Sequence, residues 1–367
     1  MTTGTNEITT DVASTALSPG GRHHLGTKGR NHLGNEGRLH RNRHAELSEV
    51  PSWLDFALCV LSFGFGFAAN QGGTCLVAAA DELAKRHPPR ILIGLVSASA
   101  AAGLVAVPLA WAAAIDGLTI TASSIDSSLL AGAVAFGIGA LVNDTCLLGS
   151  LARLGNGEVR LVALPFGLAA GMLLIDRARH DRIAMWPSLL AEPSVQGMVC
   201  LLSFLIILTL VSIILAVSEA SRPRARWPLA LSMLVLGVTG GALFALSPSW
   251  TLAQLLQHSL LLHDMRTGVV ALPAVAASVM GAFAASAGQG NMGLQEPSAR
   301  DLLRTLFGGF LMGVGISLIP GGNDGLILSA VPALSPGGFA AVLTMTATIL
   351  IGLVGRRRLA RGGRIDH

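Results

Sequence analysis

The sequence has little charge and no tyrosine. Of its 367 residues, only 13% are Asp, Glu, Lys or Arg, whereas 51% are hydrophobic. A soluble domain carries about 25% charged residues, so the composition argues against a water-soluble enzyme. The formal net charge of +4 is too small to indicate nucleic-acid binding and fits basic loops beside anionic lipid. We therefore expect an integral membrane protein that contacts the lipid bilayer and no nucleic acid.

Motifs for metals, redox dithiols and nucleotides are also missing. The four cysteines form no CxxC pair, which excludes the spacing of a zinc knuckle or a thioredoxin-like centre. No P-loop is present for ATP hydrolysis, so transport by this chain would be passive or ion-coupled. The first fifty residues contain no apolar core of the length that a cleavable signal needs. We expect no cofactor and no metal.

Apolar stretches recur along the chain from Trp53 onward, and nine of them are candidate membrane helices. The stretches that end at Asn70, Asn143 and Pro320 run into glycine or polar residues and then into another apolar helical stretch. Such broken helices are tolerated at membrane depth only where they line a cavity or are buried in protein. The nine stretches are residues 53–69, 90–114, 128–142, 161–175, 196–217, 228–246, 268–288, 302–319 and 338–355.

A constant offset of 176 residues relates two halves of the chain. It carries Gly137 onto Gly313 and the break at Thr74-Cys75 onto Trp250-Thr251. Four segments of each half obey the offset, and one spacer helix separates the halves. Because an odd spacer reverses the second half, we expect an all-α fold of two inverted four-helix repeats, as in many secondary transporters. A bundle duplicated for packing alone is the alternative.

The resulting organisation has five regions. The first is a polar tail rich in Gly, Arg and His that buries too little apolar surface to fold, so we expect disorder, with metal binding by its histidines as an alternative. The regions are residues 1–50 (tail), 51–180 (first membrane repeat), 181–225 (spacer helix and loops), 226–355 (second membrane repeat) and 356–367 (basic cytoplasmic tail).

The basic residues and tryptophans predict how the chain lies in the membrane. With the C-terminus inside, most Lys and Arg of the loops are cytoplasmic, as the positive-inside rule requires. The tryptophans lie at or near segment ends, where interfacial anchors are expected. They are Trp53, Trp111, Trp186, Trp227 and Trp250.

The three breaks contain Asn, Asp and Thr, which cap helix N-termini by accepting from unpaired backbone N–H groups. Each break is therefore expected to aim a helix N-terminus, with about half a positive charge, into the membrane interior. Such an end attracts anions, but it contributes at most ~2 kcal/mol against several kcal/mol for dehydrating an ion. Side-chain donors must supply the rest, which favours a large, weakly hydrated anion. The expected donors are Gln71, Thr74, Thr145 and Asn323.

Two carboxylates lie in these breaks, at Asp144 and Asp324. An intramembrane carboxylate is a functional candidate by default. Either residue is a candidate for coupling transport to protons. Capping of the apolar half-helix that follows is the alternative for both.

The cysteines separate into two pairs by position. Cys75 and Cys146 each begin a half-helix, whereas Cys59 and Cys200 lie within continuous apolar helix and are expected to be packing residues. A neutral thiol offers a weak S–H donor and a polarizable sulfur, which suit a sulfur-bearing substrate. We therefore expect Cys75 and Cys146 to be site residues.

At these residues the chain resembles the YeeE/YedE family of bacterial inner-membrane sulfur transporters, whose characterised activity is thiosulfate uptake. The resemblance covers about residues 53–355. It is carried by the stretches Gly64 to Cys75, Gly137 to Gly149 followed by Arg153-Leu154-Gly155, and Phe307 to Gly315 with the break after it.

The resemblance implies a central path on which three cysteines, one per break, pass thiosulfate by weak S–H hydrogen bonds. Cys75 and Cys146 match two of them, and the third position falls on Gly322, beside Asn323 and Asp324. It also implies a location in the bacterial inner membrane. The departure at Gly322 leaves the substrate open among thiosulfate and related sulfur-containing anions.

The leading hypothesis is therefore a membrane permease for such an anion, with no enzymatic activity. A membrane thiol redox enzyme that uses Cys75 and Cys146 as a dithiol is the second. The third is a non-transporting subunit of a membrane complex. A homo-oligomer and a partner sulfur-handling protein are both open.

Overall fold

Helices account for nearly all of the chain that the computed structural model describes, which comprises residues 52–112, 121–178, 185–220, 227–247, 250–261, 265–290, 292–319 and 321–362. The tail predicted at residues 1–50 lies outside the described residues. The α-helices are α2 (Ser52–Gly72), α3 (Leu76–Ala84), α4 (Arg90–Ala112), α5 (Ser127–Asn143), α6 (Leu147–Gly155), α7 (Leu164–Ala178), α8 (Val195–Ala220), α9 (Leu229–Leu246), α10 (Leu252–Leu261), α11 (Met265–Gln289), α12 (Ala299–Leu318), α13 (Asn323–Gly325) and α14 (Pro336–Gly362). They are joined by a 3-10 turn η1 (Val159–Ala163), a π-helical turn η2 (Leu326–Ala330), and two short antiparallel strands, β1 (Thr121–Ser123) and β2 (Met185–Pro187).

Eight helical segments of the described chain are long and apolar enough to cross a membrane. A ninth, shorter apolar segment spans η1 and most of α7, at Val159–Ile175. All nine predicted stretches are thus helical, which confirms an all-α membrane protein. The last helix, α14, continues to Gly362, so most of the region predicted as a basic tail prolongs this helix.

The helix boundaries repeat at the offset of 176 residues. Helices α3 and α10 begin at Leu76 and Leu252, and the half-helices after the second and third breaks begin at Leu147 and Asn323. The long helices α2, α4, α5 and α7 correspond in the same way to α9, α11, α12 and α14, although α14 continues further at its C-terminal end than α7 does.

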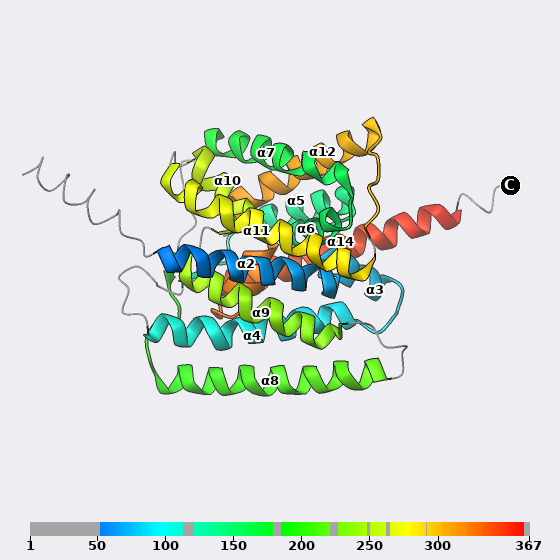
Figure 1. The fold of residues 1–367 in the computed structure, drawn as a ribbon. Helices are drawn as coiled ribbons and strands as arrows, with labels where there is room; N and C mark the ends of the chain where they lie inside the picture. Colours follow the sequence, from blue (N-terminus) through cyan, green and yellow to red (C-terminus); the bar gives the residue numbers. More distant parts are fainter. Residues whose placement is uncertain are drawn as a thin grey trace, which may run out of the picture. The chain divides into compact units, whose positions relative to one another are not determined.

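Contacts between the two halves also occur in equivalent pairs. Helix α5 packs against α14 as α12 packs against α7, and α6 packs against α11 as η2 packs against α4. The pair of α3 with α14 corresponds to that of α10 with α7. The half-helices of each half are therefore held by long helices of the other half (Figure 1).

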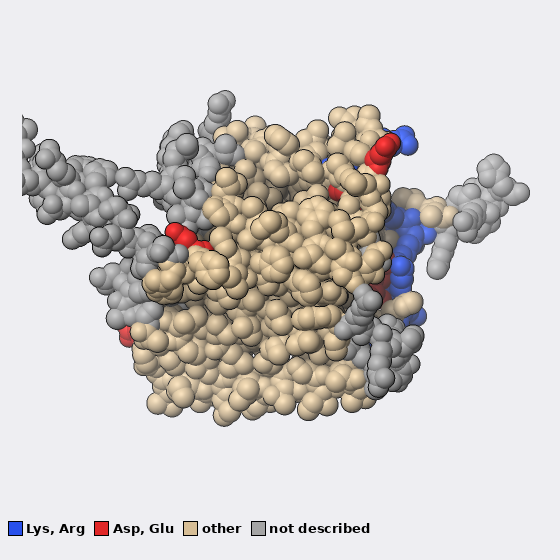
Figure 2. Space-filling model, in the orientation of Figure 1, with Lys and Arg blue, Asp and Glu red and all other residues tan. Residues whose placement is uncertain are grey.

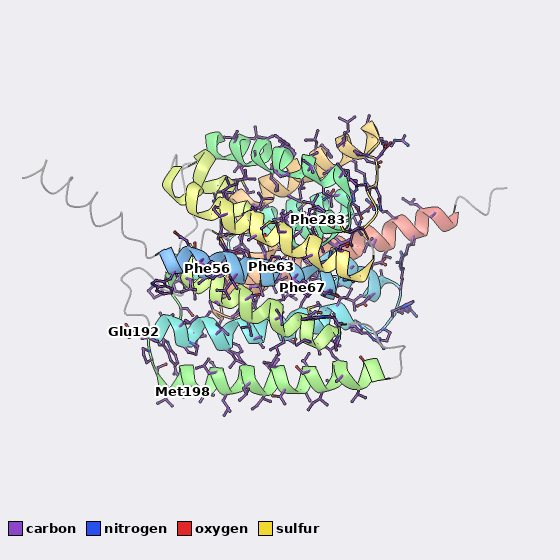
Figure 3. The ribbon with its side chains drawn as sticks, viewed as in Figure 1. Phe56, Phe63, Phe67, Glu192, Met198 and Phe283 are labelled. Atoms are coloured by element: carbon purple, nitrogen blue, oxygen red, sulfur yellow. The ribbon has the colours of Figure 1, made fainter. Side chains whose placement is uncertain are left out.

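Helix α8, the spacer between the halves, packs against α4 and α9 and otherwise presents apolar side chains outward. Met198, for example, is 61% exposed and points away from α4 (Figure 3). A helix that is apolar all round and covered on one face only suits contact with lipid.

The charged side chains lie mainly at the ends of the described helices. Figure 2 shows Lys and Arg at the end where α14 terminates and a broad face without charge beside them. Ion pairs join the basic end of α14 to other elements there, from Arg356 to Asp144 and from Arg357 to Asp81. This distribution is that of a membrane protein with one strongly basic side.

Close contact of α2 with α11 depends on glycine. A Cβ atom added at Gly66 would overlap the backbone carbonyl of Ser278, and one added at Gly281 would overlap that of Phe63. Gly64, two residues earlier on α2, has only an ordinary contact with Thr239, at 3.4 Å. Small residues are what allow membrane helices to approach backbone to backbone.

Substituting Gly66→Ala is expected to destabilise the protein by about 1–3 kcal/mol, the usual cost of overpacking a closely fitted core. Thermal unfolding in detergent, followed by thiol-reactive fluorescence of the buried cysteines, measures the change. Gly64→Ala is the matched control on the same helix and should shift the midpoint little. Equal midpoints for the two variants would contradict this role of the α2–α11 contact.

Candidate functional site

The first two breaks both place a cysteine immediately before a half-helix. Cys75 is the N-cap residue of α3 and Cys146 that of α6, and neither side chain makes a capping hydrogen bond. In the third break the equivalent residue is Gly322, the N-cap of α13. The expectation that Asn, Asp or Thr side chains cap these three helices is therefore wrong. The N–H groups of the first turns are left for other acceptors.

The two half-helices of the first half converge on the thiols. The Sγ atoms of Cys75 and Cys146 lie 3.6 Å apart, and both residues are buried. The backbone N–H of Leu76, at the start of α3, donates to Cys146 Sγ at 3.3 Å. The structure thus brings together the two cysteines singled out from the sequence, which are 71 residues apart in the chain.

Polar side chains surround this thiol pair. Thr145 Oγ1 lies 3.6 Å from Cys75 Sγ, and the Asn323 amide donates to Cys146 Sγ at 3.4 Å. Asn323 comes from the second half, so both halves contribute to the cluster. Thr145 and Asn323 are fully buried. Sulfur is a weak hydrogen-bond acceptor. The donors that bond to sulfur here can therefore also donate to a stronger acceptor, such as an anion.

Two other predicted donors have different positions. The Thr74 hydroxyl donates to the carbonyl of Ala69 at 3.2 Å and so satisfies the C-terminal end of α2. Gln71 lies half-buried in the last turn of α2, and among the described contacts of the thiol cluster none involves it. Gly73, between these two residues, has a φ of 56°, which lets the chain turn from α2 into α3.

A buried network that was not predicted holds the second break. The guanidinium of Arg160, on η1, donates to the carbonyl and side-chain oxygens of Asn143 at 3.2 and 3.1 Å and to Thr305 at 3.1 Å. Its charge is paired with Glu158 at 3.0 Å. The network ties the end of α5 to α12, and it fixes the chain just before Thr145. Arg160 and Asn143 lie 17 residues apart in the chain, and no sequence motif connects them.

Asp144 belongs to the ends of the helices and not to the thiol cluster. It is the left-handed C-cap of α5, and its carboxylate forms ion pairs with Arg304 and, at 2.9 Å, with Arg356. Its side chain is 39% exposed. The Asp144 carboxylate is therefore engaged by two guanidinium groups at the helix ends and does not reach the thiol cluster.

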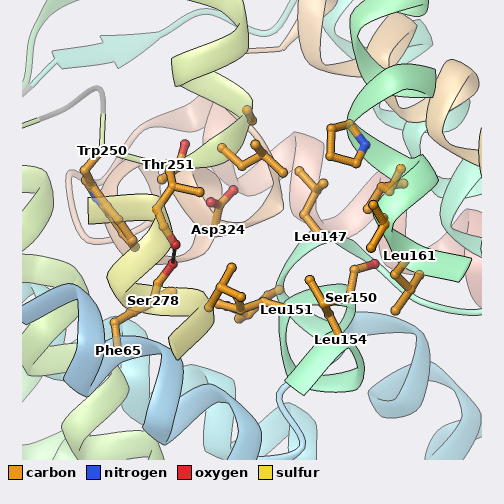
Figure 4. A pocket seen from close by; sticks show the side chains of 18 residues that line it. Phe65, Leu147, Ser150, Leu151, Leu154, Leu161, Trp250, Thr251, Ser278 and Asp324 are labelled. Carbon is orange, nitrogen blue, oxygen red and sulfur yellow. Dashed lines mark hydrogen bonds between the residues drawn. The ribbon is translucent and has the colours of Figure 1, made fainter. Parts of the chain in front are cut away.

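A cavity of about 230 Å³ lies between the halves, next to the residues that follow Cys146 (Figure 4). Its wall is formed by α2, α6, η1, α7, α10, α11 and α13, and it is largely apolar. Drug-sized ligands occupy cavities of about 300–1,000 Å³, so this one suits a small solute. Its polar side chains are Ser150, Thr251, Ser278 and Asp324.

Trp250 lines this cavity, which corrects its assignment as an interfacial anchor. It is 3% exposed, and its ring lies edge-on to Phe65 at 4.6 Å and to Phe244 at 5.5 Å. Trp53 and Trp186 are exposed at 67% and 43%, as anchors should be. Position at a segment end does not distinguish the two roles, because a break inside the protein also ends a segment.

The thiol pair has the geometry to be cross-linked. A disulfide requires about 2.05 Å between sulfurs, so the 3.6 Å separation of Cys75 and Cys146 needs only a small shift. In a Cys59→Ala, Cys200→Ala background, a small membrane-permeant oxidant should remove both remaining thiols from maleimide labelling after denaturation, and a reductant should restore them. The further variant Cys146→Ala should keep Cys75 labelled. Full labelling of both thiols after oxidation would contradict the observed proximity.

The comparisons with known proteins agree with this architecture. A family model described as sulphur transport matches residues 71–351, which include the three breaks and most of the membrane helices. No curated protein matches the chain. The match covers well over half of the sequence and includes both thiols and the cavity. The chain is therefore a member of the sulphur-transport (YeeE/YedE) family of membrane proteins.

Proposed function

We propose that the protein is a permease for thiosulfate or a closely related sulfur-containing anion, and that Cys75 and Cys146 contact the substrate on its path. The observation that carries this proposal is the thiol pair itself. Two sulfurs 3.6 Å apart are buried where the first turns of α3 and α6 meet. Family membership supports sulfur transport, and the identity of the anion is our inference from the chemistry of the cluster.

The chemistry of the cluster favours an anion that carries a soft, polarizable sulfur atom. A helix N-terminus supplies at most ~2 kcal/mol, whereas dehydrating an ion costs several kcal/mol. The remaining stabilisation must come from the N–H of Leu76, the amide of Asn323 and the two S–H groups. The thiols are weak donors with polarizable sulfur atoms, so they match the soft terminal sulfur of such an anion better than the hard oxygens of phosphate.

The proposed path crosses the membrane between the two halves. The cavity between them includes Leu147, the residue after Cys146, in its wall and is lined by helices from both halves. The basic end of the described chain, near the end of α14, then faces the cytoplasm of a bacterial cell, with the protein in the inner membrane. The anion would pass Gln71, Thr74 and Thr145 near the first-half cysteines and Gly322, Asn323 and Asp324 on the side of the second half. No chemical conversion of the substrate is required.

Uptake of labelled thiosulfate in cells that lack their own thiosulfate transporters tests the proposal. Cys75→Ala and Cys146→Ala should each lower the initial rate at least about tenfold. Each substitution removes a sulfur that contacts the substrate, and the loss of about 1.4 kcal/mol of interaction corresponds to a factor of ten. Cys59→Ala and Cys200→Ala are matched controls on continuous helices and should keep the wild-type rate. Uptake that is indifferent to both site substitutions would overturn the cysteine path, and the absence of uptake for a range of sulfur anions would overturn the permease.

The same distance supports a second candidate function, a membrane thiol redox enzyme that cycles Cys75 and Cys146 between dithiol and disulfide. Cross-linking alone does not distinguish the two, because the geometry permits a disulfide in either case. Thiosulfate uptake by protein kept fully reduced supports the permease. Loss of uptake under those conditions, together with turnover that oxidises and reduces the pair, would favour the redox enzyme.

A further inference from the structure

The two halves differ at the position where the first half carries a thiol. The half-helices α6 and α13 begin at equivalent positions, so Cys146 of the first half corresponds to Gly322 of the second. A Cβ atom added at Gly322 would lie 2.6 Å from Asp324 Oδ1 and 2.8 Å from Leu147 Cδ1. The space next to this backbone position is thus occupied by a carboxylate oxygen. Where one half presents sulfur, the other presents an acid.

Asp324 is buried and incompletely bonded. Its residue is 8% exposed, and its Oδ1 atom has no hydrogen-bond partner among the described residues. Trp250 Nε1, Gln254 Oε1 and Asn323 Oδ1 are buried without partners as well. Four such atoms at the junction of α10 and α13 mark a place that is built to receive a polar solute or a proton, since buried polar groups are otherwise paired.

The surroundings of Asp324 provide no countercharge. The cavity that it lines has three other polar side chains, the hydroxyl groups of Ser150 on α6, Thr251 at the start of α10 and Ser278 on α11 (Figure 4). α2, η1 and α7 contribute only apolar side chains to the wall. Asn323, the residue before Asp324, donates to Cys146 Sγ and so links this acid to the thiol pair. In contrast to Asp144, no Lys or Arg of the described chain pairs with this carboxylate.

We propose that Asp324 carries the proton that couples sulfur-anion uptake to the proton gradient. This inference rests on the proposed function. An ionised carboxylate in an apolar cavity repels an anion that approaches the adjoining thiol cluster. A protonated one is neutral and adds an O–H donor that the anion can accept from.

The cycle that follows balances in charge and protons. Asp324 takes one proton from the side where the anion enters, and the anion then moves past the neutral acid. The acid releases the same proton on the side where the anion leaves, which restores the carboxylate. One proton therefore crosses with each anion, and no oxidant, reductant or nucleotide is consumed.

Purified protein in liposomes that contain a pH-sensitive dye tests this coupling. Addition of external thiosulfate should drive labelled thiosulfate and protons inward together. While most of the carboxyl is ionised, its protonated fraction grows about tenfold for each unit fall in pH, so the rate of uptake should rise severalfold for each unit by which the external pH is lowered. Asp324→Asn imitates the neutral acid. This variant should still carry labelled thiosulfate down its concentration gradient. It should show no proton influx, and its rate of uptake should not depend on pH.

Two further variants complete the test. Asp126→Asn changes an exposed carboxylate at the start of α5 to another good N-cap residue, and it should keep both the proton influx and the pH dependence. Asp324→Glu keeps an ionisable group and should keep proton influx, which separates proton carrying from a purely structural role. Should Asp324→Asn fail to fold, the wild-type influx and Asp324→Glu still decide the matter.

The failure of this inference is distinguishable from the failure of the permease. Wild-type uptake without proton influx, or Asp324→Asn that still takes up protons with thiosulfate, would overturn the role of Asp324 and leave the permease intact. Absence of uptake by the wild type would overturn both. Infrared difference spectra on lowering the pH give a readout independent of transport. They should contain the carbonyl band of a protonated carboxylic acid, and its persistence in Asp324→Asn would assign it to another residue.

Discussion

Unpaired backbone groups at the helix breaks are the constraint on which the rest of this structure depends. In lipid, a broken helix must satisfy its free N–H and C=O groups inside the protein. Here α3 and α6 begin without a side-chain cap, and an N–H group of one half-helix donates to the thiol of the other break. The long helices of the opposite half close around these ends, so the breaks are buried in protein and not exposed to lipid.

Supporting contacts make this arrangement specific. Asn70, in the last turn of α2, donates to the carbonyl of Ala152 and to Asn156, both at 2.8 Å, and so joins the first break to the end of α6. Arg160 holds Asn143 at the second break. The half-helix α6 is thus fixed at both ends, as a site for a small solute requires when its donors are backbone N–H groups.

The two halves share a backbone plan but differ in chemistry at its centre. Thiols occupy two equivalent half-helix starts in the first half, whereas Thr251 and Gly322 occupy them in the second, with a carboxylate folded beside the glycine. Under the proposed coupling of uptake to protons, the difference has electrical consequences. Moving one elementary charge against 100 mV costs about 2.3 kcal/mol, so a dianion entering a negative interior costs about 4.6 kcal/mol, and a single accompanying proton halves that cost.

Much of the fold could be predicted because lipid imposes a simple rule on composition. Long apolar stretches must be helices, and each predicted stretch is one. The repeat was visible in a handful of glycines, and the helix starts at Leu76, Leu252, Leu147 and Asn323 obey its offset. The predictions from local sequence were wrong where residues with similar sequence positions have different surroundings in the structure. Trp250 ends a segment yet is buried, and Asp144 resembles Asp324 in sequence yet lies among arginines.

The sequence by itself determined the class of the protein, the approximate ends of its long apolar helices, the doubling of its plan and the two cysteines that lie at the breaks. Hydropathy, glycine spacing and position at a break are local properties of the chain. Only the tertiary structure decided which polar groups are paired. It placed Cys75 against Cys146, gave Asp144 two guanidinium partners and left an oxygen of Asp324 with no partner among the described residues. Whether a carboxylate is paired with a basic side chain depends here on residues more than 150 positions away in the chain, and no local sequence pattern indicates such a distant contact.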